Sequence, residues 1–311
     1  MVSRVVLHIG MMKTGSTSQQ QFLEDNRDAL SELGFHYYKP LCCFNPYLGH
    51  NNAGFLVDAT FQRIGTLRED SIAGIAQIEE ELAALAEYCA GRDGTLILSE
   101  ELLSRYGRGP FWRAARDLLS ECCTGAEIDV IVYLRRQDLW LLSNWKQRVK
   151  GMVKEWRTFE SYVARTTSEY AQRLDYSILL HDLEEAFGKE HLIVRVFESS
   201  QLKNGDAVAD FCEAVGIPQD GSLVTSRKRK NTSLSLSQTE VLRAYNQITG
   251  EFGNRLMLLM VALSKIHRPG HEEYPLGEER RKELIERYAD SNRRVAERYL
   301  GRSELFSKPD E

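Results

Sequence analysis

Short apolar runs alternate with helix-like stretches over the first two thirds of the chain. Strand-length runs cover residues 4–9, 34–38, 94–99, 127–134 and 191–196. A continuous apolar run such as Val130 to Leu134 is typical of a strand that is buried on both faces, as in a parallel sheet. Helical patterns fill most of the gaps, over residues 16–33, 71–90, 110–123, 138–153 and 176–187. This alternation predicts a three-layer α/β fold, with a central parallel sheet flanked by helices.

After about residue 205 the pattern becomes helical only. The first helical segment covers 206–215 and is ended by Gly216, with Pro218 soon after. Further helical segments cover 236–248, 252–266 and 277–300. The sequence shows no internal repeat and no low-complexity linker. We therefore predict a single domain over 1–311, in which residues 1–205 form the α/β core and residues 206–311 a mainly helical C-terminal lobe.

Composition excludes several classes of protein. With 311 residues, 42% of them apolar and 27% charged, the chain is long enough to bury a sizeable core. A net charge of -5 gives no whole-protein attraction to nucleic acid. No apolar run has the length of a membrane span or of a secretory leader, so we expect a cytoplasmic protein. The six cysteines lack metal-binding spacing, which predicts reduced thiols packed as small apolar side chains; they stand at positions 42, 43, 89, 122, 123 and 212.

The segment from Gly10 to Ser18 joins the first strand-like run to the first helical stretch. A glycine-bearing turn before a helix start exposes backbone N–H groups and the positive end of the helix dipole, which suits a phosphate-like anion. Lys13 adds a point charge, and hydroxyl donors are added by Thr14, Ser16, Thr17 and Ser18. The plainer interpretation is a tight turn that happens to be rich in hydroxyls.

This loop differs from the P-loop of nucleoside triphosphatases. That motif places its lysine directly after the second glycine, whereas Lys13 precedes Gly15 here. No clear strand ending in a magnesium-binding aspartate follows. A P-loop small-molecule kinase that uses Mg-ATP is therefore retained as an alternative function.

The segment Lys13-Thr14-Gly15-Ser16-Thr17-Ser18 resembles the loop of the bacterial sulfotransferase family that holds the 5′-phosphosulfate of 3′-phosphoadenosine 5′-phosphosulfate. Many members have a proline where this chain has Met12. The resemblance implies a P-loop-like sulfotransferase fold in which the whole segment binds the co-substrate. It also implies that Lys13 stabilises the leaving group, and that no metal cofactor is required. Residues 191–216 and 291–301 extend the resemblance over nearly the full chain.

Two further cation-bearing segments fit that resemblance. The family places an arginine at the end of a later strand and a serine eight residues on, both at the 3′-phosphate; Arg135 and Ser143 match this spacing, with Arg136 as a competitor. The alternative for this pair is a solvated helix start. The family also has a late basic loop near the 3′-phosphate and the adenine. Arg229 and Lys230 are our candidates from the run 227–230, for which a solvated basic surface is the alternative.

A sulfate acceptor needs a base to take its proton. Glu101 is our first choice because it follows the strand-like run 94–99, and Glu100 could substitute. A helix-start carboxylate favoured by the dipole is the plainer interpretation. His50, in a polar glycine-containing loop, is our second choice, whereas His8 and His36 lie in strands and are expected to be core residues.

Together these features predict the transfer of a sulfuryl group from 3′-phosphoadenosine 5′-phosphosulfate to a hydroxyl or amine. The acceptor is expected to be a small molecule or a glycan, and its identity and the oligomeric state are left open. Besides the kinase, a non-catalytic nucleotide-binding protein with the same fold is retained as an alternative.

Overall fold

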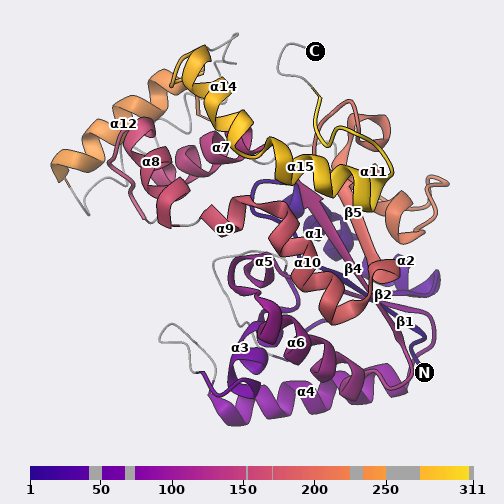
Figure 1. Cartoon of the computed structure of the whole chain (residues 1–311). Coiled ribbons are helices and arrows are strands. Elements are labelled where there is room, and N and C mark those ends of the chain that lie inside the picture. The colour runs from indigo at the N-terminus through magenta and orange to yellow at the C-terminus, as the bar shows by residue number, and fades with distance from the viewer. Residues whose placement is uncertain are drawn as a thin grey trace. The chain divides into compact units, whose positions relative to one another are not determined.

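A computed structural model describes residues 1–41, 51–66, 74–151, 153–169, 171–224, 234–249 and 274–307 (Figure 1). The chain forms two compact units. The first comprises Met1–Arg135, Tyr176–Ser226 and Val295–Glu311, and the second Arg136–Asp175 and Arg227–Arg294. Where the chain leaves and re-enters the first unit, the Tyr176 hydroxyl donates to the carbonyl oxygen of Arg135. A single domain with a division near residue 205 remains a prediction.

The first unit contains a sheet of five parallel strands in the order β2-β3-β1-β4-β5. Each strand lies within a run that the sequence predicted, so the α/β fold class is confirmed. Their bounds are β1 Arg4–His8, β2 Phe35–Tyr37, β3 Thr95–Ser99, β4 Glu127–Leu134 and β5 Leu192–Val196. The register aligns His8 with Ser99 on one side and with Ile131 on the other. The segments that follow β1 and β3 therefore leave the sheet side by side, and β4 extends along the same edge.

Side chains alternate between the two faces of the sheet, and each face is covered by its own helices (Figure 1). Val5 and Leu7 of β1 point to a face that packs on α3 (Gly54–Arg63), α4 (Ile75–Ala90), α6 (Gly109–Cys122) and α10 (Tyr176–Phe187). Val6 points to the opposite face, which packs on α1 (Ser16–Asp25), α2 (Arg27–Glu32) and α11 (Ala207–Val215). The predicted three layers are therefore present.

Two predicted helices are each divided. The stretch 16–33 breaks at Asn26, whose side-chain amide donates to the carbonyl oxygens of Phe22 and Val224 and accepts from the Val224 N–H. The stretch 277–300 is α14 (Glu278–Arg287), α15 (Ala289–Val295) and a π-helical turn over Ala296–Leu300. The predicted helix 252–266 lies outside the described residues. The sequence analysis missed α3 and three further helices, namely α5 (Leu102–Tyr106), α8 (Phe159–Glu169) and α9 (Ala171–Leu174).

The second unit packs its helices on a core of aromatic and aliphatic side chains around Trp140 and Trp145. Its main helices are α7 (Gln137–Lys150), α8, α12 (Leu236–Thr249) and α14. A fully buried carboxylate, Asp138, pairs with Arg136 and Arg281, each at 2.8 Å. Among the described helices, none combines the length and the apolar character needed to cross a lipid bilayer.

Candidate functional site

The candidate site lies where the first unit's strands end. Lys13 follows β1, Glu101 follows β3 and Arg135 follows β4, and these three strands are neighbours in the sheet. Ligands of open α/β sheets bind at this carboxyl edge, because the loops that leave neighbouring strands converge there. The fold thus brings together the lysine, the carboxylate and one arginine that the sequence singled out.

The loop between β1 and α1 has an unusual backbone. Lys13 has φ +71° and Gly15 has φ +85°, so both adopt the left-handed conformation. A Cβ on Gly15 would lie only 3.0 Å from a ring carbon of Phe197 and from the Cβ of Ala207. Glycine is therefore required at this position on two grounds, namely its φ and its close packing. This tight turn leads directly into the first turn of α1, where the Ser18 N–H donates to the Gly15 carbonyl oxygen at 2.9 Å. A helix start of this kind suits an anion.

The four hydroxyls of the loop fall into two environments. Thr14 is buried and donates to the carbonyl oxygen of Met11, while buried Ser16 donates to the carboxylate of Glu101. Thr17 and Ser18 are exposed in the first turn of α1. Thr14 and Ser16 therefore shape the loop and its surroundings, which leaves the hydroxyls of Thr17 and Ser18 at the surface where a ligand has access.

The two adjacent arginines after β4 have different surroundings. Arg135 Nη1 donates to the carbonyl oxygen of Lys13 at 2.7 Å, and its guanidinium lies 5.5 Å from the ring centre of Phe197. Arg136 is only 6% exposed and is engaged with Asp138. Arg135 is therefore the arginine that contacts residues 10–18, the candidate anion loop, whereas Arg136 lies in the second unit and pairs with Asp138 there. Ser143 lies on α7 of that second unit, so its pairing with Arg135 stays a prediction.

The adjacent residues Glu100 and Glu101 have different hydrogen-bond partners. Glu100 is fully buried, accepts from the Leu102 N–H at 2.9 Å where α5 begins, and accepts from the Asn51 side chain. Glu101 instead points to the loop, where it accepts from Ser16. Glu101 stands at the N-cap position of α5 but makes no side-chain bond to that helix, so both the base and the helix-start carboxylate stay open as its role.

The environment of Glu101 makes it a stronger base than an ordinary carboxylate. Burial and, to a lesser extent, the nearby charge of Glu100 raise its pKa to about 7, against the opposing effect of Lys13. At neutral pH such a carboxyl group exchanges a proton readily, as a general base must.

A network of buried polar side chains links α1 to the ends of β1 and β3. Gln20 Nε2 donates to Ser99 Oγ at 3.0 Å, and the same oxygen lies 2.9 Å from His8 Nδ1. Burial lowers the pKa of His8 to about 4, so its ring is neutral. His8 is thus a hydrogen-bonded core residue, as the sequence predicted.

Three predicted site residues lie outside the part of the chain that the structure describes: His50, Arg229 and Lys230. Conversely, sequence reasoning missed Phe197, which packs against Gly15, and Ser104, whose hydroxyl donates to the Gly10 carbonyl at 3.2 Å. Phe197 directly follows β5, so the rule that ligands bind at strand ends would have found it. Ser104 gave no comparable signal.

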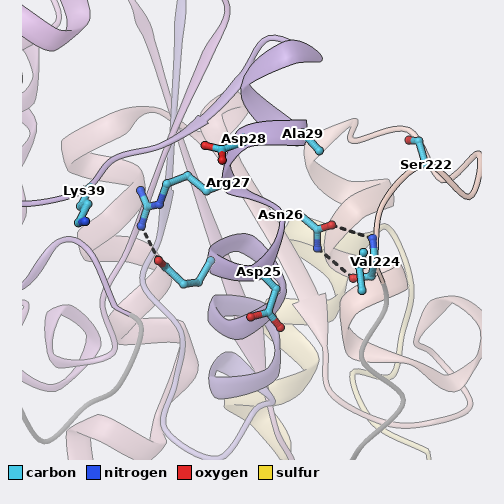
Figure 2. Close-up of a pocket in the computed structure, with 9 residues that line it drawn as sticks. Asp25, Asn26, Arg27, Asp28, Ala29, Lys39, Ser222 and Val224 are labelled. Carbon is cyan, nitrogen blue, oxygen red and sulfur yellow. Dashed lines mark hydrogen bonds and ion pairs between the residues drawn. The ribbon is translucent and has the colours of Figure 1, made fainter.

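A shallow hollow lies at the opposite end of α1 from the anion loop. Figure 2 shows it at the junction of α1 and α2, where Asn26 binds Val224 and Arg27 pairs with Glu24. Its lining comprises Glu24, Asp25, Asn26, Arg27, Asp28, Ala29, Lys39, Ser222 and Val224. None of the site residues described above borders this hollow. Over the described ranges, no three His, Cys, Asp or Glu side chains are grouped to hold a metal ion.

Comparisons with known proteins are sparse. No protein-family model matches the chain. An uncharacterized protein from Archaeoglobus fulgidus is 30% identical over 189 residues, which cover 58% of this chain and 48% of that protein. The chain thus matches about half of that relative's length. A solved sulfotransferase from Alicyclobacillus acidocaldarius aligns over 78% of this chain and 94% of its own, with a TM-score of 0.41 and 14% identity. The function must therefore be argued from the site itself.

Proposed function

We propose that this protein is a sulfotransferase, which moves a sulfuryl group from 3′-phosphoadenosine 5′-phosphosulfate to a hydroxyl or amine of a small-molecule or glycan acceptor. One observation carries the proposal. A carboxyl group with a pKa of about 7, on Glu101, is hydrogen-bonded to Ser16 in the first turn after the anion loop. This contact supports the proposal because it brings a candidate base to the loop that would hold the anion, as transfer to an acceptor hydroxyl demands.

The loop would bind the phosphosulfate end of the co-substrate. Sulfuryl transfer resembles phosphoryl transfer in being an in-line displacement, in which the leaving phosphate oxygen gains negative charge. Lys13 and the N–H groups at the start of α1 would stabilise that charge. Arg135 keeps the Lys13 backbone in place and, with Ser143, would bind the 3′-phosphate. Arg229 and Lys230 would add further cations there.

Glu101 would accept the proton of the acceptor. The hydroxyl of Ser16 fixes the orientation of its carboxylate, and Lys13 keeps a fraction ionised at neutral pH by opposing the effect of burial. The position of Glu101 supports an enzyme over a non-catalytic nucleotide-binding protein, which would not need a base. His50 remains the second candidate for the base.

Calorimetry with adenosine 3′,5′-bisphosphate and with Mg-ATP tests the choice of nucleotide. We expect the bisphosphate to bind and Lys13→Ala to weaken it. Lys39→Ala is the matched control, because Lys39 borders the hollow at the far end of α1 and should leave binding unchanged. Binding of Mg-ATP without any binding of the bisphosphate would favour the kinase alternative and refute the proposal.

Turnover is tested separately, with radiolabelled 3′-phosphoadenosine 5′-phosphosulfate and a panel of phenols, alcohols, amines and glycans. We expect transfer to at least one acceptor and loss of that transfer in Lys13→Ala. Bisphosphate binding with no transfer to any member of the panel would favour the non-catalytic alternative.

A further inference from the structure

Two buried cysteines from different helices lie in direct contact in the first unit. Cys89 is in the last turn of α4, and Cys123 directly follows α6. Their sulfur atoms are 2.6 Å apart, which is closer than two unbonded sulfurs normally pack, and each residue is only 2% exposed. Both are free thiols. Nothing in the proposed transfer reaction uses them.

The other two described cysteines, Cys122 and Cys212, have different surroundings. Cys122 directs its thiol to the carbonyl oxygen of Leu82, at 3.6 Å. Cys212 is buried in the core on the opposite face of the sheet. Among the described cysteines, Cys89 and Cys123 are therefore the pair that the fold brings together.

We propose that Cys89 and Cys123 form a dithiol–disulfide site, in which oxidation by a small-molecule disulfide links the end of α4 to the end of α6. The new bond joins the two protein sulfurs. The two thiols lose two protons and two electrons, and the small-molecule disulfide takes these up as it is cleaved to two thiols.

The two sulfurs share one hydrogen bond, in which either thiol can be the donor. This contact lowers the pKa of Cys89 and raises that of Cys123, so we expect Cys89 to attack first. It attacks the small-molecule disulfide and releases one thiol; Cys123 then loses its proton, attacks the Cys89 sulfur and releases the second. Because both sulfurs are buried, we expect slow reaction that needs local opening at the end of α6.

This site lies away from the anion loop. The carbonyl oxygen of Cys89 accepts from the Val2 N–H just before β1, and that of Cys123 accepts from the Ala126 N–H just before β4. Both contacts are at the amino ends of the strands, whereas Lys13 and Glu101 follow the carboxyl ends. The bond would close a loop of the chain that contains β3 and Glu101. We therefore expect oxidation to raise stability and to leave bisphosphate binding unchanged.

Thiol counting on the full-length reduced protein tests the proposal. The folded protein is incubated with oxidised glutathione, and free thiols are counted after unfolding. We expect the loss of two of the six thiols, a rise in Tm that dithiothreitol reverses, and a cross-linked peptide pair containing Cys89 and Cys123. Cys122→Ser should lose two thiols as well and show the same rise in Tm.

Cys89→Ser and Cys123→Ser should show no oxidation-dependent rise in Tm. Peptide mapping of the unmodified protein keeps the test decisive even where a variant folds poorly. The proposal is overturned if Cys89 and Cys123 stay reduced in the folded protein, or if the mapped bond joins other cysteines.

Discussion

The guanidinium of Arg135 donates to the carbonyl oxygen of Lys13 across 2.7 Å. This bond ties the end of β4 to a lysine with φ +71°, a conformation that costs a non-glycine residue about 1 kcal/mol. We therefore expect Arg135 to affect ligand binding in two ways. Its hydrogen bond holds the backbone of the anion loop in place, and its positive charge attracts the anionic ligand directly. A lysine at this position would preserve only the charge.

We accordingly expect Arg135→Lys to weaken binding of adenosine 3′,5′-bisphosphate. Arg135→Gln should weaken it by roughly 10- to 100-fold, the loss of affinity that corresponds to one or two hydrogen bonds from a charged group. Isothermal titration calorimetry measures both. Arg116→Gln is the control, since Arg116 binds Asp117 and the Ala186 carbonyl, away from the loop. Unchanged affinity in Arg135→Gln would remove Arg135 from the site.

Glu101→Gln should lower kcat by about 100-fold or more, because an amide cannot take the acceptor's proton. Binding of the bisphosphate should change little. In the unmodified protein, kcat/KM should rise with pH and level off above a midpoint of about 7, the pKa of Glu101. Steady-state kinetics over pH 5 to 9 measure this. An unaltered rate in Glu101→Gln would transfer the role of base to His50.

The same carboxyl group makes a separate prediction about stability. The folded pKa of Glu101 is about 7 and lies above its unfolded value of 4.5, so the folded state binds the extra proton between these values. Its favourable contribution is complete below about pH 4.5 and is lost as the pH rises through 7. Glu101→Gln should therefore be more stable than the unmodified protein at pH 8, with a gap that narrows toward pH 5. Thermal melts at both pH values would show it, and a gap independent of pH would contradict it.

His8 should have the opposite dependence. Its folded pKa of about 4 lies below its ordinary value of 6.5, so between these values the unfolded chain binds a proton that the folded protein does not bind. The free energy of unfolding should fall by at most about 3 kcal/mol as the pH drops from 6.5 to 4. Since Glu101 acts in the other direction over this range, the difference between His8→Gln and the unmodified protein isolates the histidine. Denaturant titrations at several pH values measure this difference.

Gly15→Ala and Gly34→Ala form a matched pair. Both glycines have positive φ, +85° and +80°, but a Cβ at Gly34 would meet nothing within 4 Å. Gly34→Ala should cost about 1 kcal/mol of stability for backbone strain alone. Gly15→Ala should cost more, because its Cβ also meets Phe197 and Ala207, and it should weaken bisphosphate binding as well. Urea unfolding measures the loss of stability in the two variants, and calorimetry measures their affinity for the bisphosphate. Equal effects in both variants would contradict the close packing of Gly15 against Phe197 and Ala207.

The strands could be predicted because continuous apolar runs have few alternatives to a buried strand. The break at Asn26 could not, because its cause is a bond to Val224, 198 positions away. Similarly, no local pattern distinguishes Glu100 from Glu101. Their roles diverge only because one side chain meets the Leu102 N–H and the other meets Ser16, which lies 85 positions away. The ends of the strands predicted where the candidate site should lie, whereas the contacts of each of its residues come from the tertiary fold.

The bond between Tyr176 and Arg135 has a consequence for how this chain can vary. Residues 136–175 begin after Arg135 and end before Tyr176, and these two flanking residues are hydrogen-bonded to each other. The segment is therefore an insertion in the connection between β4 and α10. We expect that segment 136–175 can change in length while β4 and α10 keep their places, as long as its helices keep the core that they share with α12 and α14. Evolution and protein engineering alike could then alter this segment without changing the register of the sheet.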